Sequence, residues 1–260
     1  MAAHPSTTVY LIPCWLEDQT LAPVPAYILD AVKTCNVFFV ENERSARRYL
    51  KALWKEMVID QYEWHAIHKL EPETLSTFRA ALAAGKTIGI LSEAGCPGIA
   101  DPGQLLIAIA HETGATVRPL VGPSSILLAL MASGLNGQQF KFNGYLPVDS
   151  ADRIAAIRNL ETESARAGCT QIFIETPYRN NQLLAALLAT CRPSTRLTIA
   201  ANLTGPGEYV RTLPISRWRQ LAPPPADPSN STDPSNSTDP SNSTDLPDLH
   251  KQPTIFCFLA

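Results

Sequence analysis

Short apolar runs recur along the first part of the chain, and a segment with helical periodicity follows each one. Strands are predicted at Val9–Ile12, Val37–Val40, Thr87–Leu91 and Thr116–Leu120. Helices are predicted between and after them, at Ala26–Thr34, Ser45–Lys55, Thr74–Ala84 and Gly103–Glu112. Because fully apolar strands that alternate with helices are typical of parallel sheets, this part is predicted to form an open parallel α/β sheet.

The pattern changes after Leu120. The turn Val121–Ser125 leads into the apolar helix Ile126–Ala132, and shorter, more closely spaced strands follow. These strands are predicted at Phe140–Leu146, Thr170–Ile174, Arg196–Ala201, Glu208–Leu213 and Thr254–Leu259, with helices around Asp152–Thr162 and at Asn180–Cys191. We therefore expect two α/β domains, residues 1–121 with a mainly parallel sheet and residues 122–260 with a mixed sheet.

One segment of the second domain has no apolar residue. The hexapeptide DPSNST occurs three times in Asp227–Thr244, directly after a proline-rich stretch. Such a tract cannot offset the entropy of ordering by burying apolar surface. We expect a disordered, low-complexity insert at about residues 223–250 that acts as a spacer.

Composition and charge narrow the class of protein. The chain has 260 residues, 45% of them hydrophobic and 17% charged, and a formal net charge of −3. The longest apolar run, Ile126–Ala132, is far shorter than the ~20 residues of a membrane span. The first residues have no basic region followed by a long apolar one, so no signal peptide is expected. The six scattered cysteines form no CxxC pair, which predicts free thiols in a cytoplasmic protein and no metal site.

Three polar loops follow predicted strands, at the strand ends where parallel sheets bind ligands. The first is Ser92–Gly103, with three glycines and two prolines; the others are Val121–Ser125 and Glu175–Asn181. Glycines let a ligand approach the backbone closely, and prolines fix the course of a loop. The alternative is a tight connection without a ligand. The chain has neither a GxGxxG motif after a strand nor a P-loop.

At these loops the sequence resembles a known family, the tetrapyrrole methylase superfamily of S-adenosylmethionine-dependent methyltransferases. The segment SEAGCPGIADPG is similar to the motif S-D-A-G-T-P-x-I-x-D-P-G of its small-subunit ribosomal RNA cytidine 2′-O-ribose methyltransferase group. VRPLVGPSSILLALMASGL, FKFNGYLP, IETPYR and AANLT match further motifs of that group in the same order. The chain departs from the group at Pro13–Gln19, where a glycine is lost, and at Glu41-Asn42-Glu43-Arg44, which replaces E-D-T-R.

The resemblance implies two α/β domains with S-adenosyl-L-methionine in the cleft between them. By position, the residues implied to bind this cofactor are Glu93, Ala94, Gly95, Cys96, Gly122, Ser124, Ser125, Thr176, Pro177, Ala201 and Leu203. The methyl acceptor is implied to be the ribose of an RNA, as in rRNA processing, and the protein is expected to be a homodimer. Two alternatives are methylation of a small molecule such as a tetrapyrrole, and a cofactor-binding module without catalysis.

A ribose hydroxyl is a poor nucleophile, so a general base would assist such a reaction. Strand-end carboxylates are the candidates: Glu93, Asp101 and Glu175, with Glu41 as a further one. Asp101 is alternatively a helix cap, and Glu41 a solvated or capping charge. A basic face comprises Arg44, Arg47, Arg48, Lys51 and Lys55, whose spacing places them on one side of a helix. This face is predicted to hold RNA phosphates; the alternative is a solvated face partly neutralised by nearby glutamates.

Overall fold

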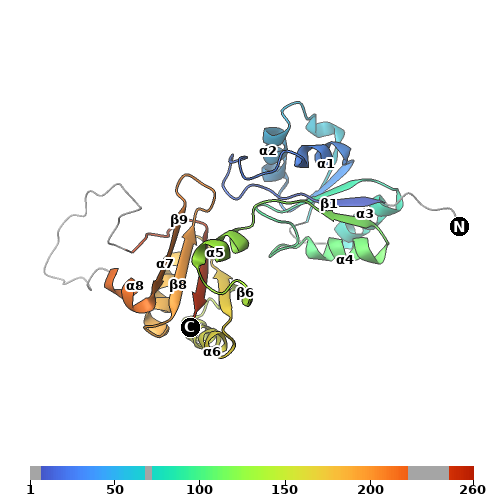
Figure 1. Ribbon diagram of the computed structural model, residues 1–260. Coiled ribbons are helices and arrows are strands. Elements are labelled where there is room, and N and C mark those ends of the chain that lie inside the picture. Colours follow the sequence, from blue (N-terminus) through green and yellow to red (C-terminus); the bar gives the residue numbers. More distant parts are fainter. Residues whose placement is uncertain (1–6, 68–71, 222–245) are drawn as a thin grey trace. The chain divides into compact units, whose positions relative to one another are not determined.

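The computed structural model describes residues 7–67, 72–221 and 246–260 (Figure 1). The chain divides into two compact units, Met1–Ser124 and Ser125–Ala260, where the sequence places the change between residues 121 and 122. The repeat tract Asp227–Thr244 lies outside the described residues. Leu249 is fully buried in the core of the second unit, so packed structure resumes before residue 250, within the span that the sequence predicts to be disordered.

The first unit contains a five-stranded sheet in the order β3-β2-β4-β1-β5. Its strands are β1 (Thr8–Leu11), β2 (Val37–Val40), β3 (Glu63–Ala66), β4 (Ile88–Leu91) and β5 (Thr116–Pro119). All neighbouring pairs are parallel. The prediction of a parallel α/β sheet is confirmed, and its central strands β2 and β4 are buried at every position.

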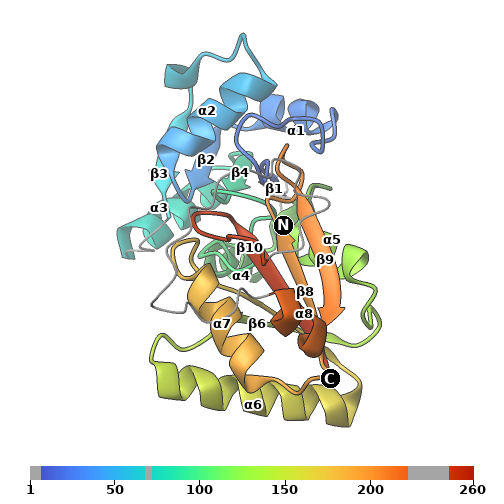
Figure 2. The same ribbon diagram turned by 90° about the vertical axis from the view of Figure 1, so that its left-hand side faces the viewer.

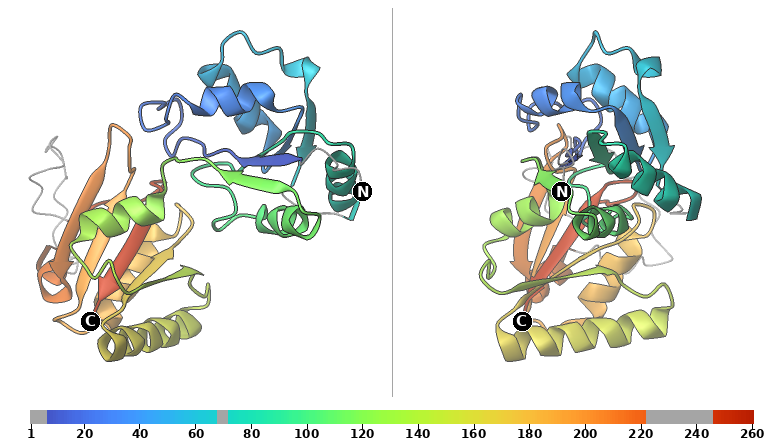
Figure 3. Two further views of the ribbon diagram at one scale, coloured as in Figure 1. Left: turned by 45° about the vertical axis from the view of Figure 1, so that its right-hand side comes forward. Right: turned by 90° about the vertical axis from the view of Figure 1, so that its right-hand side faces the viewer.

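Two pairs of helices cover the two faces of this sheet (Figure 3). Helices α1 (Ile28–Thr34) and α2 (Glu43–Leu53) share a core with Phe38 and Val40. On the other face, α3 (Pro72–Ala83) and α4 (Gln104–Glu112) share a core with residues that include Phe39 and Ile90. The adjacent strands β1 and β4 therefore lead to helices on opposite faces. Such a switch point opens a crevice at the carboxyl ends of the strands, where α/β proteins bind ligands.

Local sequence signals set the helix ends in this unit. The side chain of Asn42 caps α2 by accepting hydrogen bonds from Arg44 N at 3.0 Å and Ser45 N at 3.2 Å. After α3, Gly85 has φ +71°, the left-handed conformation that its position predicts. The sequence does not predict β3, because this edge strand, Glu63–Ala66, is only half-buried and has no apolar run. A short 3₁₀ helix, Ile59–Gln61, precedes it.

The second unit contains a mixed five-stranded sheet in the order β6-β7-β10-β8-β9. Its strands are β6 (Phe140–Tyr145), β7 (Thr170–Ile174), β8 (Arg196–Ala201), β9 (Tyr209–Pro214) and β10 (Thr254–Leu259). β6 pairs with β7 in parallel, and the remaining pairs are antiparallel. The prediction of a mixed sheet is confirmed, and the C-terminal strand β10 occupies its centre.

Helices flank this second sheet (Figure 2). They are α5 (Ser125–Ser133), α6 (Ser150–Ala167), α7 (Asn180–Thr190) and α8 (Ile215–Leu221). Helices α6, α7 and α8 pack on the face that presents Phe256 and Phe258, whereas α5 packs against β8, β9 and β10. Trp218 is fully buried and its Nε1 donates a hydrogen bond of 2.9 Å to Leu197 O. Within the described ranges, no helix is both long and apolar enough to cross a membrane.

Candidate functional site

The glycine-rich loop 92–103 joins β4 to α4 and is fastened to the loop that follows β1. Cys14 N donates to Gly95 O at 2.8 Å, and the two residues form an isolated β-bridge. Gly95 has φ +73°, a left-handed backbone conformation that residues other than glycine rarely adopt. A Cβ there would lie 3.3 Å from Leu16 Cδ2 and 3.6 Å from Pro123 O. The loop is therefore shaped by its backbone and lies at the crevice between β1 and β4.

Asp101 braces the far end of this loop. Its carboxylate accepts hydrogen bonds from Gly98 N at 2.9 Å and from Gly103 N at 2.7 Å. Burial raises the pKa of Asp101, the two backbone hydrogen bonds lower it, and the nearby Glu41 carboxylate raises it again; the net direction is upward. Backbone donors thus occupy the carboxylate that the sequence predicts as a possible base, and they hold the turn that leads into α4.

The loop after β5 packs on the same residues. Cys96 Sγ donates to Pro123 O at 3.4 Å, so the second predicted loop contacts the first. A Cβ at Gly122 would lie 2.2 Å from Pro13 Cβ, so only glycine fits this close approach. The structure therefore brings together Gly95, Cys96 and Gly122 within the first unit. Ser124 is half-buried at the end of this unit, and Glu93 and Ala94 are exposed on the loop.

The third predicted loop follows β7 in the second unit. Glu175 is buried, and its Oε1 accepts from Thr176 N at 2.6 Å and from Arg179 Nη2 at 2.6 Å. Among the described residues, its buried Oε2 has no hydrogen-bond partner, and neither has the buried Asn180 Oδ1 on the same loop or Thr204 Oγ1 after β8. Half-buried Thr176 and Pro177 and buried Ala201 and Leu203 lie on these two loops. Half-buried Ser125 begins α5. The meeting of this loop with the other two stays a prediction.

The basic face of α2 is largely occupied by local interactions. Arg47 pairs with Glu43 at 2.8 Å and its guanidinium lies over the Trp64 ring. Arg48 pairs with Asp18 at 3.2 Å. Lys51 Nζ donates to the carbonyls of Lys55 and Met57 beyond the end of the helix. Within the described part of the chain, this leaves two side chains of the face without a partner, Arg44 and Lys55.

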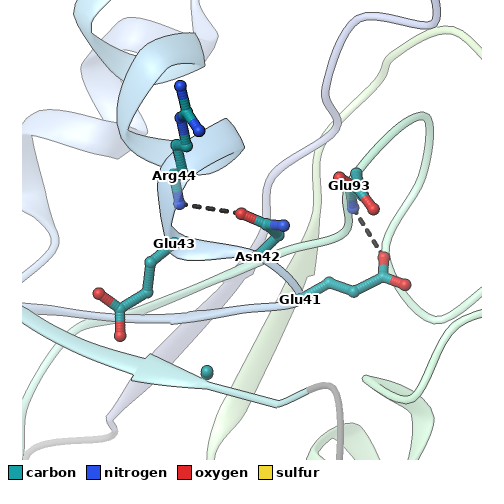
Figure 4. Close-up of a pocket in the computed structure, with 6 residues that line it drawn as sticks. Glu41, Asn42, Glu43, Arg44 and Glu93 are labelled. Atoms are coloured by element: carbon teal, nitrogen blue, oxygen red, sulfur yellow. Dashed lines mark hydrogen bonds between the residues drawn. The ribbon is translucent and has the colours of Figure 1, made fainter.

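A shallow pocket, open to solvent, lies beside the glycine-rich loop, at the carboxyl ends of β2, β3 and β4. Its volume is ≈ 550 Å³, and it is lined by Glu41, Asn42, Glu43, Arg44, Ala66 and Glu93. Figure 4 shows the Glu41 carboxylate directed toward the backbone of Glu93, whose N–H donates to Glu41 Oε2 at 2.8 Å. The Arg44 side chain extends along α2, away from these two residues (Figure 4).

Sequence reasoning found this pocket only in part. It names Glu93 and Arg44 as site residues and Glu41 as a candidate base, but it misses Asn42, Glu43 and Ala66. Ala66 ends β3, the strand that the sequence does not predict. The signal for Asn42 is the N-cap position before the periodic segment of α2, a position that lies at the end of β2.

The cysteines are free thiols, four of them buried: Cys14, Cys35, Cys191 and Cys257. Burial raises the pKa of Cys35 and Cys257 to about 12, and burial with the nearby Glu161 does the same for Cys191. Of these four, Cys14 contacts the glycine-rich loop, where its Sγ donates to Ser92 O at 3.3 Å. Across residues 7–67, 72–221 and 246–260, no group of three or more His, Cys, Asp or Glu side chains could hold a metal ion.

The two α/β units, one with a parallel sheet and one with a mixed sheet, form a fold that solved structures share. Crystal structures of diphthine synthase and of uroporphyrin-III-C-methyltransferase from Thermus thermophilus align with TM-scores of 0.63 and 0.52. They cover 98% and 97% of this chain, over 90% and 94% of their own, at 14% and 16% sequence identity. Residues 26–217 match the family of Tetrapyrrole (Corrin/Porphyrin) Methylases, and the chain belongs to this family.

The curated relatives of this chain have higher sequence identity than the solved structures, and they carry a more specific name than the family. Ribosomal RNA small subunit methyltransferase I of Mesorhizobium japonicum is 31% identical over 192 residues, covering 74% of this chain and 63% of that protein. The protein of the same name from Micromonospora olivasterospora is 31% identical over 201 residues, covering 76% and 60%. The chain thus spans less than two thirds of the length of these relatives.

Proposed function

We propose that this protein is an S-adenosylmethionine-dependent methyltransferase that methylates a ribose 2′-hydroxyl of small-subunit ribosomal RNA. The observation that carries the proposal is the 31% identity to ribosomal RNA small subunit methyltransferase I over 74% of the chain. This match accompanies a glycine-rich loop, 92–103, that lies at the ligand-binding crevice of the sheet.

The residues of both units fit the methyl donor that the family implies. In the first unit, Gly95 has φ +73° and Gly122 has no room for a side chain beside Pro13, so these loops meet through their backbones, and a ligand at this edge would meet backbone groups. In the second, the buried atoms Glu175 Oε2, Asn180 Oδ1 and Thr204 Oγ1 find no partner in the described part of the chain. Buried polar atoms without partners are costly, and a ligand with ammonium, amino and hydroxyl groups would pair with them where these loops admit it. We assign the binding of S-adenosylmethionine to these loops, including Thr176, Pro177, Ala201 and Leu203.

Methyl transfer from S-adenosylmethionine requires no covalent intermediate with the protein. When bound, S-adenosylmethionine supplies an electrophilic methyl group. The work of this chain is then to orient the acceptor hydroxyl, exclude water and take up a proton. The proposed roles divide accordingly: the glycine-rich loop positions the donor, strand-end carboxylates serve the acceptor, and cations of α2 hold RNA phosphate. Of these cations, Arg44 is the one that lines the pocket.

We further propose that the protein is a cytoplasmic homodimer. Support for the dimer comes from apolar side chains that the second unit leaves exposed on α5, with Leu127 50% and Met131 78% accessible. Sedimentation at micromolar concentration should give the mass of a dimer, and a monomer would contradict this part of the proposal.

A methyl-transfer assay tests the proposed function. Tritiated S-adenosylmethionine is incubated with the protein and either small ribosomal subunits from a strain that lacks it or uroporphyrinogen III. We expect label in the RNA and none in the tetrapyrrole. Label in the tetrapyrrole alone would favour small-molecule methylation. Cofactor binding by calorimetry without transfer to either acceptor would favour a binding module.

A further inference from the structure

Three carboxylates line the pocket at the ends of β2, β3 and β4, and they differ in their ion pairs, exposure and hydrogen bonds. Glu43 is paired with Arg47 at 2.8 Å, so its charge is neutralised. Glu93 is exposed, and no described residue contacts its carboxylate, so its position is not fixed. Glu41 is half-buried, and one of its oxygens is held by Glu93 N at 2.8 Å. No described residue donates to Glu41 Oε1, which stays available to a ligand.

Asp101 and Glu175, the other strand-end carboxylates with a fixed orientation, are occupied or enclosed by protein. Asp101 accepts backbone hydrogen bonds from Gly98 and Gly103. Glu175 is buried and paired with Arg179 at 2.6 Å. A general base must be oriented toward the proton that it removes and must be free to accept it. Glu41 alone among these carboxylates combines a fixed orientation with an unoccupied oxygen beside a pocket.

The hydrogen bond that orients Glu41 comes from the glycine-rich loop itself. Glu93 belongs to loop 92–103, to which we assign the methyl donor, and Glu41 follows β2 in the same unit. The carboxylate and the loop are therefore joined by a direct bond within one packed unit. The pocket is open to solvent, so a nucleotide that is part of a longer RNA can enter it, and Arg44 at its edge offers an unpaired cation for phosphate.

We propose that this pocket takes the RNA nucleotide that is methylated, and that Glu41 is the catalytic residue that removes the proton from its ribose hydroxyl. The inference rests on the proposed function and extends it to the acceptor side of the reaction. The hydroxyl oxygen forms a bond to the methyl carbon as the carbon–sulfur bond breaks. The electron pair of that bond goes to sulfur, and the hydroxyl proton goes to Glu41 Oε1.

The test uses Glu41→Gln in the full chain. The glutamine oxygen can still accept the hydrogen bond from Glu93 N, and the volume is kept, so the loop retains its anchor while the base is lost. We expect the single-turnover rate of methyl transfer to small ribosomal subunits to fall by about 100-fold or more. Calorimetric affinity for S-adenosylmethionine and affinity for the ribosomal subunit should both stay within about twofold of the wild type, since neither contact to the loop nor charge on Arg44 is removed.

The matched control is Glu56→Gln, which removes an exposed carboxylate outside the pocket and should leave the rate unchanged. A Glu41→Gln rate within about threefold of an active wild type would overturn the role of Glu41. A rate loss accompanied by an equal loss of S-adenosylmethionine affinity would also overturn it, because Glu41 would then only hold the loop. If the wild-type protein itself transfers no methyl group to RNA while it binds the cofactor, the proposed function fails, and this inference with it.

Discussion

A methyl group at Gly95 should separate the structural role of this glycine from a role in cofactor binding. Gly95 has φ +73°, where an alanine costs about 1–2 kcal/mol of conformational strain. Replacing glycine also reduces the freedom of the unfolded chain, which returns about 0.4–1 kcal/mol. The new Cβ would lie 3.3 Å from Leu16 Cδ2, a side-chain end that can move by the few tenths of an ångström required. Gly95→Ala should therefore lower the free energy of unfolding by about 1 kcal/mol.

Gly114 provides a matched control. It has φ +74°, nearly the same conformation, and a Cβ there would meet no atom within 4 Å. Gly114→Ala should thus lose a similar free energy of unfolding in urea titrations, about 1 kcal/mol. Only Gly95→Ala places its methyl group on the loop to which we assign the cofactor, where Gly95 O also accepts from Cys14 N.

The assay is calorimetric titration of both variants with S-adenosylmethionine. We expect Gly95→Ala to bind at least about tenfold more weakly, a loss of about 1.4 kcal/mol, and Gly114→Ala to bind like the wild type. Equal affinity of the two variants would refute the placement of the cofactor against Gly95. Equal weakening would show that general destabilisation, rather than the loop, controls binding.

Three further predictions concern the thiols, the second core and the basic helix. Burial shields four cysteines and raises their pKa, so at pH 8 Ellman's reagent should modify only half-buried Cys169 and, more slowly because burial raises its pKa too, Cys96 until the protein unfolds. Early reaction of all six cysteines would contradict the buried assignments. Trp218→Phe removes side-chain volume and the buried hydrogen bond to Leu197 O, and should lower the free energy of unfolding in guanidinium by about 2 kcal/mol. A decrease below about 0.5 kcal/mol would be inconsistent with the buried position of Trp218. Arg44→Ala should weaken RNA binding and reduce the slope of log affinity against log salt by about 1 in filter-binding titrations. Arg48→Ala should change the affinity and the slope less, because Arg48 already pairs with Asp18; a larger effect of Arg48→Ala would place the phosphate contact at Arg48 instead.

The buried strands were predictable because a short apolar run in an α/β pattern indicates a strand that is buried in the sheet. Val37–Val40 and Arg196–Ala201 are strands in the structure with the bounds predicted from sequence. The edge strand Glu63–Ala66 was not predictable in the same way, since partial exposure removes the apolar signal. The ion-pair partners of side chains were not predictable either. Spacing places Arg47 and Arg48 on one face of α2, but it does not show that they pair with Glu43 and Asp18.

The candidate site shows the same division between local pattern and tertiary contact. The composition of loop 92–103 predicts a shaped, ligand-binding turn at a strand end, and the structure places that loop at the crevice of the first sheet. Sequence alone treats Glu41 and Asp101 as comparable strand-end carboxylates. Their hydrogen bonds distinguish them, because backbone donors saturate Asp101 and leave one oxygen of Glu41 open.

The most direct test of the central claim is mass spectrometry of nucleosides from small-subunit RNA. Small ribosomal subunits from a strain that lacks this protein are incubated with the purified protein and S-adenosylmethionine that carries a deuterated methyl group. The account predicts a 2′-O-methylated nucleoside that carries the deuterated methyl group and is absent when the protein is omitted. Small-subunit RNA without any deuterated ribose methyl group, from a protein that binds S-adenosylmethionine in calorimetry, would contradict it.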